Sequence, residues 1–134
     1  MVLETFATLR IFSASICPEV ITDRLGLESN TGYIRDPDAR RRSKRETNYW
    51  GWCTKDELES TDNLVHIKAI IKRFKQKAVL LKELRSEECQ MDICCYFVTS
   101  GQGGPYMDLS AMNALYKLGL EIWWDVYFGS EDES

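Results

Sequence analysis

The sequence predicts an α+β domain: a single, mostly antiparallel sheet with one long and two short helices packed on one face. Segments rich in β-branched and aromatic residues alternate with segments whose apolar residues recur every three or four positions, in the order β-α-β-β-α-β-α-β. Each predicted helix has one apolar side, so a single helix layer on the sheet buries all of them. The 134 residues suit one domain. We expect that domain over residues 1–129, with an acidic tail at 130–134.

The first two elements lie near the start of the chain. Thr5–Phe12 is rich in β-branched and aromatic residues and partly alternating, which predicts a strand. Cys17–Leu27 predicts a short helix, because Pro18 suits a first helical turn and Gly26 suits the position just past a helix end.

A polar segment follows at residues 28–47. Its stretch Arg35–Arg45 carries six basic and two acidic residues and almost no apolar ones, which predicts a mobile loop insert between short strands. Asn48–Thr54 predicts the next strand, since its aromatic residues return at alternating positions.

The longest predicted element is a helix that Asp62 caps and that runs to about Ser86. No glycine or proline interrupts it. One apolar stripe at spacings of three and four follows its length: Leu64, Ile67, Ile71, Phe74, Ala78, Leu81 and Leu84. Met91–Val98 then predicts a strand that is apolar enough to be central in the sheet.

The last helix and strand occupy the C-terminal part. Leu109–Leu118 predicts a short helix, with Ser110 as a candidate cap and Gly119 at its end. Glu121–Phe128 alternates, so one set of its side chains faces the helices and the other, including Trp123, Asp125 and Tyr127, faces away. We expect this second face to include also Thr8, Arg10, Phe12, Asp92, Cys94 and Tyr96.

That second face is too apolar to be idle solvent surface. We expect the 28–47 segment, a partner protein or a second copy of the chain to cover it. A salt bridge from Arg10 to a neighbouring carboxylate is the favoured interpretation of its acids, ahead of a catalytic or metal-binding group built from Asp92, Glu121 and Asp125.

Charge and cysteine content narrow the classes of function. The net charge of −4 argues against a general nucleic-acid binder. Five cysteines exclude a complete disulfide framework, and the adjacent Cys94 and Cys95 point to opposite faces of a strand. Buried structural thiols are the favoured interpretation. We expect a cytoplasmic protein, because the sequence shows neither a signal peptide nor an apolar run that would span a membrane.

Motifs spread over nearly the whole chain resemble a family of small bacterial proteins, the domain-of-unknown-function family numbered 4279. The motifs are Ala7–Phe12 with Pro18–Thr22 and Leu25–Leu27, then Trp50–Trp52, and finally Cys95–Phe97 with Ser100–Pro105, Leu118–Glu121 and Asp125–Phe128. The resemblance implies a single α+β domain and carries over no catalytic residue. Some such proteins look like immunity or defence-neighbourhood proteins.

The glycine-rich loop Ser100–Tyr106 is the first candidate site. It precedes a helix, where backbone N–H groups can hold an anion. It lacks the Gly-Lys-Ser or Gly-Lys-Thr of a phosphate loop, and Tyr106 stands where the dinucleotide pattern requires glycine. A structural turn is the favoured interpretation. An anion nest is the alternative, with Ser100, Gln102, Gly103, Gly104 and Tyr106 as its candidate residues.

Two other features carry weaker signals. His66 is the single histidine, and no local pattern makes it a catalytic or zinc-binding residue, so we expect a histidine that packs or lies at the solvent edge of the helix. The basic run Arg40–Arg45 stands just before aromatic Trp50. A solvated loop is the favoured interpretation of this run. A site for an acidic protein is the next alternative, and a nucleic-acid site is the least favoured.

The sequence therefore favours a non-enzymatic interaction module that binds a partner protein or self-associates, for example as a homodimer, with an immunity-type role suggested by the resemblance. The alternative is a small-ligand or anion-binding protein that uses the loop at 100–106. No cofactor, no metal and no membrane is expected. The candidate contact residues outside the loop are Arg10, Trp50, Trp123, Asp125 and Tyr127.

Overall fold

The computed structural model describes residues 1–129; the predicted acidic tail, residues 130–134, lies outside them. The elements are β1 (Val2–Ser13), α1 (Pro18–Leu25), β2 (Thr31–Tyr33), α2 (Arg42–Glu46), β3 (Asn48–Cys53), α3 (Asn63–Phe74), α4 (Ala78–Ser86), β4 (Gln90–Thr99), α5 (Leu109–Leu118) and β5 (Glu121–Phe128). The predicted fold class is confirmed, and the strands follow one another as expected.

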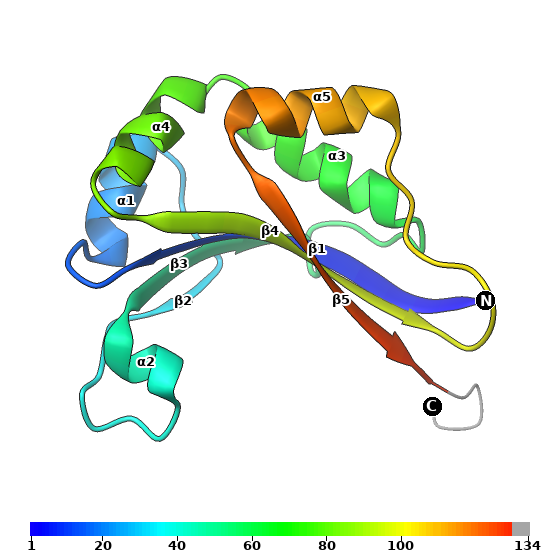
Figure 1. Cartoon of the computed structure of the whole chain (residues 1–134), viewed down its shortest axis with the longest axis horizontal. Coiled ribbons are helices and arrows are strands. Elements are labelled where there is room, and N and C mark those ends of the chain that lie inside the picture. Colours follow the sequence, from blue (N-terminus) through cyan, green and yellow to red (C-terminus); the bar gives the residue numbers. More distant parts are fainter. Residues whose placement is uncertain (130–134) are drawn as a thin grey trace.

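The five strands form one sheet in the order β2-β3-β1-β4-β5. The β1 strand is central and pairs antiparallel with both β3 and β4, and β2 pairs antiparallel with β3. Only β5 runs parallel to its neighbour β4, because α5 carries the chain back across the sheet between them. Figure 1 shows α1, α3, α4 and α5 on one side of the sheet and α2 alone on the other.

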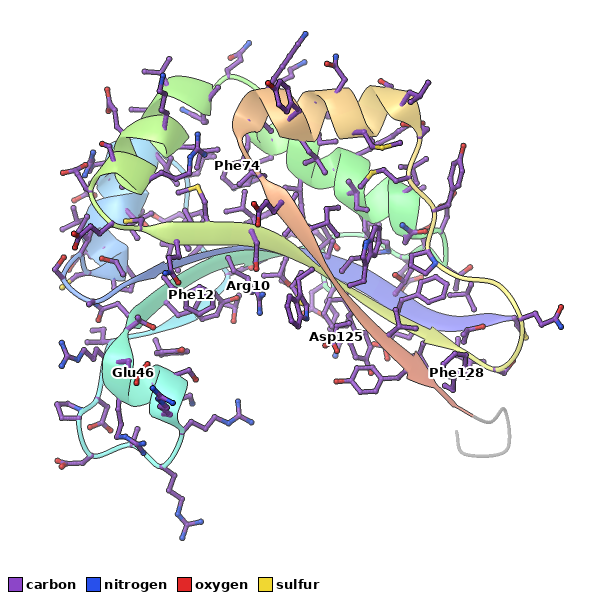
Figure 2. All side chains as sticks on the ribbon, viewed as in Figure 1. Arg10, Phe12, Glu46, Phe74, Asp125 and Phe128 are labelled. Atoms are coloured by element: carbon purple, nitrogen blue, oxygen red, sulfur yellow. The ribbon has the colours of Figure 1, made fainter. Side chains whose placement is uncertain are left out.

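The hydrophobic core lies between the sheet and the four helices. Phe74 lies among the helices (Figure 2), where its ring meets the edges of Trp50 and Trp52 at 6.1 and 6.2 Å between centroids. Trp50 is fully buried, and its indole Nε1 donates to Thr22 Oγ1 at 2.9 Å. Trp50 was predicted as a contact residue, and this placement corrects that prediction, because alternation along β3 turns its side chain into the core.

The predicted helix from Asp62 to Ser86 is divided into α3 and α4. The break falls at Lys77, whose backbone leaves the helical region and whose N–H donates to Phe74 O at 2.8 Å. A continuous helix of this length would extend about 37 Å. The break instead lets α3 lie over β1 while α4 packs beside α1 and α5. Asp62 caps α3 as predicted and accepts from Leu64 N at 3.0 Å.

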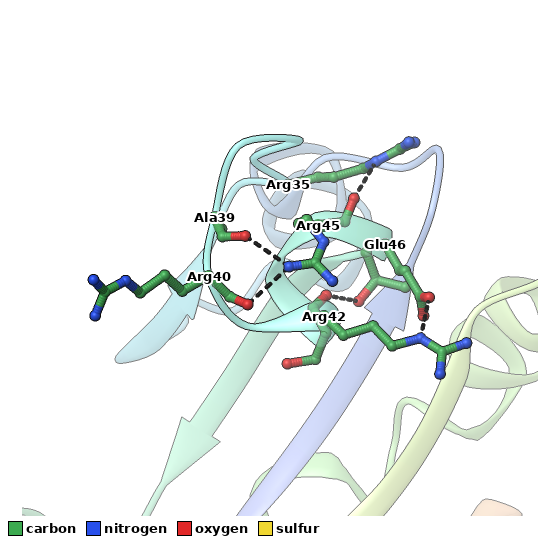
Figure 3. Close-up of polar contacts among 8 residues, drawn as sticks. Arg35, Ala39, Arg40, Arg42, Arg45 and Glu46 are labelled. Carbon is green, nitrogen blue, oxygen red and sulfur yellow. Dashed lines mark hydrogen bonds and ion pairs between the residues drawn. The ribbon is translucent and has the colours of Figure 1, made fainter.

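The basic 28–47 segment, predicted as a loop, contains β2 and α2, so that prediction is corrected. Its own arginines stabilise the segment by hydrogen bonds to backbone carbonyls (Figure 3). Arg45 Nη1 donates to the carbonyls of Ala39 and Arg40 at 2.9 and 2.8 Å, and Arg35 Nε donates to the Arg45 carbonyl at 2.8 Å. The guanidinium fork satisfies several carbonyls at once, which lets a segment with few apolar residues keep one conformation.

The α5 helix begins at Leu109 and ends at Leu118, as predicted, but its cap differs. Asp108, not Ser110, accepts a hydrogen bond from Ala111 N at 2.8 Å, while Gly119 adopts the left-handed conformation with φ of 71° at the end. Within residues 1–129, the helices are too short or too polar to cross a membrane.

Candidate functional site

We call the side of the sheet that faces away from α1, α3, α4 and α5 the open face. Strand alternation sets which side chains point there: Phe6, Thr8, Arg10 and Phe12 of β1; Tyr49, Gly51 and Cys53 of β3; Asp92, Cys94 and Tyr96 of β4; and Trp123, Asp125 and Tyr127 of β5. The contacts among these residues confirm the predicted second face. The 28–47 segment reaches it through Tyr33 against Tyr49, and Lys55, just after β3, places its ammonium over the Phe6 ring at 5.3 Å.

Aromatic rings cross the open face in two rows. In one row, Phe6 stacks on Tyr96 with ring centroids 4.7 Å apart, and Tyr96 meets Tyr127 at 5.4 Å. In the other, Phe12 stacks on Tyr49 at 5.0 Å. Each row joins side chains from neighbouring strands, so the rings are held in place by one another as well as by the backbone.

A row of small side chains lies between the aromatic rows, and we call it the trough. Thr8 of β1 stands opposite Cys53 of β3 on one side and Cys94 of β4 on the other. Trp123 of β5 stands beside Cys94 and closes that end. Near Cys53 the trough deepens into a hollow of about 400 Å³, which Phe6 and Tyr49 flank and which polar and charged residues complete: Asn30, Thr31, Lys55, Asp56 and Glu57. The trough therefore offers aromatic walls, a floor of small residues and a polar rim.

One charge pair lies at the edge of the trough. Arg10 and Asp92 are cross-strand neighbours, and Arg10 donates to both carboxylate oxygens at 2.8 and 2.7 Å. This hydrogen bonding raises the pKa of Arg10. The predicted salt bridge is confirmed. Glu121 lies beside Asp92 in the register, but both Asp92 oxygens already accept from Arg10. Within residues 1–129, no three His, Cys, Asp or Glu side chains gather to hold a metal ion.

Burial changes the acidity of several groups around the trough. Loss of solvent raises the pKa of Tyr49 to about 12, and burial also raises the pKa of Cys94. A Cβ atom at Gly51 would clash with the Tyr49 side chain, so glycine there lets the ring lie across β3. On β5, a hydrogen bond to Asp125 raises the pKa of Tyr127. Tyr49 and Tyr127 thus stay neutral phenols at physiological pH.

The cysteines divide by face, as alternation predicts for the adjacent pair. Cys95 is buried on the helix side, where loss of solvent raises its pKa to about 11, whereas Cys94 lies half-buried on the open face. Cys89 is buried as well. Cys17 is exposed and Cys53 is half-buried, so the prediction of buried thiols is correct for Cys89 and Cys95 only.

The glycine-rich loop at 100–106 is fixed at both ends and exposed between them. Ser100 N donates to Met1 O at 2.9 Å, and Asn63 exchanges two hydrogen bonds with the backbone of Tyr106 at 2.8 and 2.9 Å. The carboxylate of Asp108 occupies the N-terminus of α5 and pairs with Lys68 at 2.9 Å. These bonds, the one from Ala111 N first, lower the pKa of Asp108. A carboxylate of the chain already occupies the place where an anion would bind.

The predicted contact residues fall into separate places. Arg10, Trp123, Asp125 and Tyr127 share the open face. Trp123 stands beside Cys94, six residues and therefore about 20 Å along the strand before Ser100. Tyr127 stands beside Val98, two residues before Ser100, so the open face comes close to the start of the loop at this end of β5, while Gln102, Gly103 and Gly104 belong to the loop.

His66 is buried and fully engaged. Ala7 N donates to Thr54 Oγ1 at 3.0 Å, the Thr54 hydroxyl lies 2.6 Å from His66 Nδ1, and His66 Nε2 lies 2.8 Å from the Ser60 carbonyl. A carbonyl only accepts, so Nε2 carries the proton and Nδ1 accepts from Thr54. Of the two predicted places for His66, this network confirms the packed one, and it ties α3 to β1 and to the residues after β3.

Sequence analysis missed Phe6, Tyr49 and Cys53 as open-face residues. Their signal was present in the alternation: Phe6 lies two positions before Thr8, and Tyr49 and Cys53 have the opposite parity to the core residue Trp50. The register between strands, which brings them into rows, follows only from the folded sheet.

Comparison with protein families gives one match. The family model described as Domain of unknown function (DUF4279) matches residues 3–129, which is nearly the whole chain. No curated protein and no solved structure matches the chain.

Proposed function

Because the chain belongs to the DUF4279 family, whose description names no activity, we propose its function from its own surface: it is a non-enzymatic module that binds a partner protein through the open face. One observation carries this proposal. Two rows of aromatic rings flank a trough of small side chains on a sheet face that leaves Trp123 61% exposed. Apolar patches of this kind on soluble proteins mark interaction sites.

The residue types on the open face are those of protein interfaces. Interface centres are rich in Tyr, Trp, Phe and Arg and poor in unpaired charge. The open face has this composition, and the charge of Arg10 is already balanced by Asp92. A partner would place apolar side chains against Phe6 and Tyr49, and polar or charged groups against Lys55, Asp56 and Glu57, which line the same hollow.

The basic segment around α2 indicates which charge the partner protein carries. Figure 1 shows α2 projecting on the same side of the sheet as the open face, and Figure 3 shows the Arg40 side chain directed away from the turn. Arg42 and Lys44 are exposed on the same helix. Complementary charge steers association and fixes orientation. We therefore propose a protein partner with an acidic region beside its apolar contact.

The groups that a hydrolase would use are engaged in structure. Both His66 nitrogens and both Asp92 oxygens have partners within the fold. This supports a binding role rather than catalysis. An immunity-type role, which the family resemblance suggested, would make the partner a toxin. The alternative of an anion site at loop 100–106 has less support, because Asp108 already occupies the N-terminus of α5.

The proposal is tested by capturing partners from the native host with the full chain and two matched variants. Cys53→Arg places a long cation in the hollow of the trough. Val79→Arg places the same side chain on the outer surface of α4, where Val79 is 69% exposed. We expect the wild type and Val79→Arg to capture the same protein and Cys53→Arg to lose it.

Each variant is checked for folding by circular dichroism and thermal unfolding before the capture. If a folded Cys53→Arg chain captures the same protein as the wild type, the open face is not the binding surface. Loss in Val79→Arg alone would place the contact on the helix side, and loss in both variants would show that the effect is not specific to the open face; either result contradicts the proposal.

A further inference from the structure

The outer edge of the sheet at β5 is a second apolar surface. The strand exposes large apolar side chains on both of its faces: Trp123 by 61%, Trp124 by 39%, Val126 by 39%, Tyr127 by 50% and Phe128 by 79%. Phe128 lies at the far end of the strand (Figure 2). An edge strand with this composition is a template for pairing with another chain.

The β5 strand lacks the features that usually protect a sheet edge. Its sequence has no proline and no lysine, and its eight residues keep an unbroken register with β4. The other edge differs, because β2 is only three residues long and the α2 segment continues from it. Natural proteins shorten, bend or charge their free edges. The β5 strand is long and regular, and its charges are limited to Glu121 and Asp125, so its edge can accept a partner strand.

The hydrogen bonds of β5 determine which of its backbone groups are free. Gly129 N donates to Thr99 O at 3.0 Å, so the odd-numbered residues of β5 direct their N–H and C=O toward β4. The even-numbered residues Ile122, Trp124 and Val126 therefore direct theirs outward. An antiparallel strand that binds this edge must place its own outward-directed residues opposite these three.

We propose that β5 pairs with β5 of a second copy, antiparallel and centred on Trp124. Trp124 then faces Trp124, and Ile122 faces Val126 in both directions. These are the residues with free backbone groups, and this register overlaps the two strands over their full length. It joins two five-stranded sheets into one continuous sheet, with both helix layers on the same side.

The charges of β5 agree with this register. Glu121 falls opposite Tyr127, and Asp125 falls opposite Trp123, so no carboxylate faces a carboxylate. Registers centred on Trp123 or Asp125 would also set outward-directed residues opposite one another, but they would oppose Glu121 to Asp125, or Asp125 to itself. Like charges directly opposite destabilise a strand pair.

The proposed pairing of two β5 strands would also cover an apolar groove beside β5. This groove, about 370 Å³ in volume, lies between α5 and β5 and is lined by Met107, Met112, Leu115, Tyr116, Leu120, Ile122 and Trp124. The proposed register brings Phe128 of the second copy opposite Leu120, at the groove. The exposed phenyl ring of one copy and the open groove of the other would thus cover each other. This inference does not depend on a partner at the open face.

The test uses complementary charges at the proposed two-fold axis. We expect light scattering during size-exclusion chromatography to give the wild type a mass twice the 15.5 kDa of one chain. Trp124→Lys and Trp124→Glu should each elute as monomers, because like charges would meet at the axis. An equimolar mixture of the two variants should recover the double mass, which shows that each variant is folded and that position 124 faces position 124.

A third variant tests whether backbone hydrogen bonds hold the two β5 strands together. Val126→Pro removes an N–H that points outward and leaves the bonds to β4 intact, so a folded monomer is expected. The inference is overturned if the wild type is a monomer, if Trp124→Lys alone keeps the double mass, or if the mixture of charged variants stays monomeric. The variant Cys53→Arg, which disturbs the open face, should remain dimeric whatever its effect on partner capture.

Discussion

Tyr49 shows how a single residue links the open face to stability. Its phenol is half-buried between Phe12 and Tyr33, and loss of solvent raises its pKa from 10.0 to about 12 in the folded chain. The unfolded chain ionises first, so the contribution of Tyr49 to stability is complete below pH 10 and is lost as the pH rises through 12.

Tyr49→Phe should therefore lose less stability than the wild type between pH 10 and pH 12. Urea unfolding at a series of alkaline pH values measures this, and tyrosinate absorbance follows the ionisation directly. Tyr116→Phe is the matched control, because Tyr116 is 84% exposed on α5. If the two variants show the same pH dependence, Tyr49 is not protected from solvent as described.

The His66 network gives a second prediction at this scale. Thr54 and His66 are both buried, and the Thr54 hydroxyl donates to His66 Nδ1, in addition to the bonds that Thr54 makes with Ala7 N and His66 makes with the Ser60 carbonyl. Replacing one of them leaves the other unsatisfied, at a cost of about 1–3 kcal/mol. Thr54→Val and His66→Leu should each lower the free energy of unfolding by about that amount.

The double variant supplies the control for this network. Because the second replacement removes the group that the first left unsatisfied, the two losses should combine to less than their sum. Denaturant unfolding of the four chains measures the coupling. Strict additivity would contradict the bond between Thr54 and His66.

At the scale of the element, the loop after β4 raises the question whether its glycines are needed for the backbone conformation or for binding a ligand. Gly103 has a φ of 107°, which other residues rarely adopt, whereas Gly104 has an ordinary φ, and a Cβ at either position would meet no atom within 4 Å. Gly103→Ala should therefore destabilise the fold by about 1 kcal/mol or more, while Gly104→Ala should be neutral or slightly stabilising.

Thermal unfolding of both glycine variants measures this difference, and phosphate added to the wild type tests the anion alternative. We expect phosphate to leave the midpoint of unfolding unchanged, because Asp108 already occupies the N-terminus of α5. A clear stabilisation by phosphate that Gly103→Ala abolishes would favour an anion site in the loop.

The elements also show what periodicity can and cannot predict. Alternation placed β5 at its observed bounds, and caps placed both ends of α1 and α5 within a residue or two. The break between α3 and α4 escaped prediction because Lys75, Gln76 and Lys77 are ordinary helix residues. Packing against different neighbours, rather than a local breaker, ends α3 there. The α2 turn escaped because arginine-to-carbonyl bonds leave no periodic signal.

For the whole molecule, the sequence predicted the layers and the composition of the open face, but not how its residues meet. Arg10 and Asp92 lie 82 positions apart and pair only because β1 and β4 are neighbours in register. The trough likewise needs three strands to bring Cys53, Thr8 and Cys94 into one row. The free β5 edge follows from strand order, since any strand beyond β5 would have covered it.

Strand order also places the two proposed surfaces side by side. A pair of chains joined at β5 would present two open faces on the same side of one sheet, because antiparallel pairing in the proposed register keeps both helix layers together. Binding to a partner at the trough and pairing at the edge share Trp123 but centre on different residues, and the variants Cys53→Arg and Trp124→Lys separate them.

The central claim is that the open face binds a partner protein, and calorimetric titration of the captured partner tests it most directly. The account predicts that Val79→Arg binds with wild-type affinity, whereas Cys53→Arg binds at least about tenfold more weakly, a loss of roughly 1.4 kcal/mol or more. Equal affinities of folded Cys53→Arg and wild-type chains would contradict it.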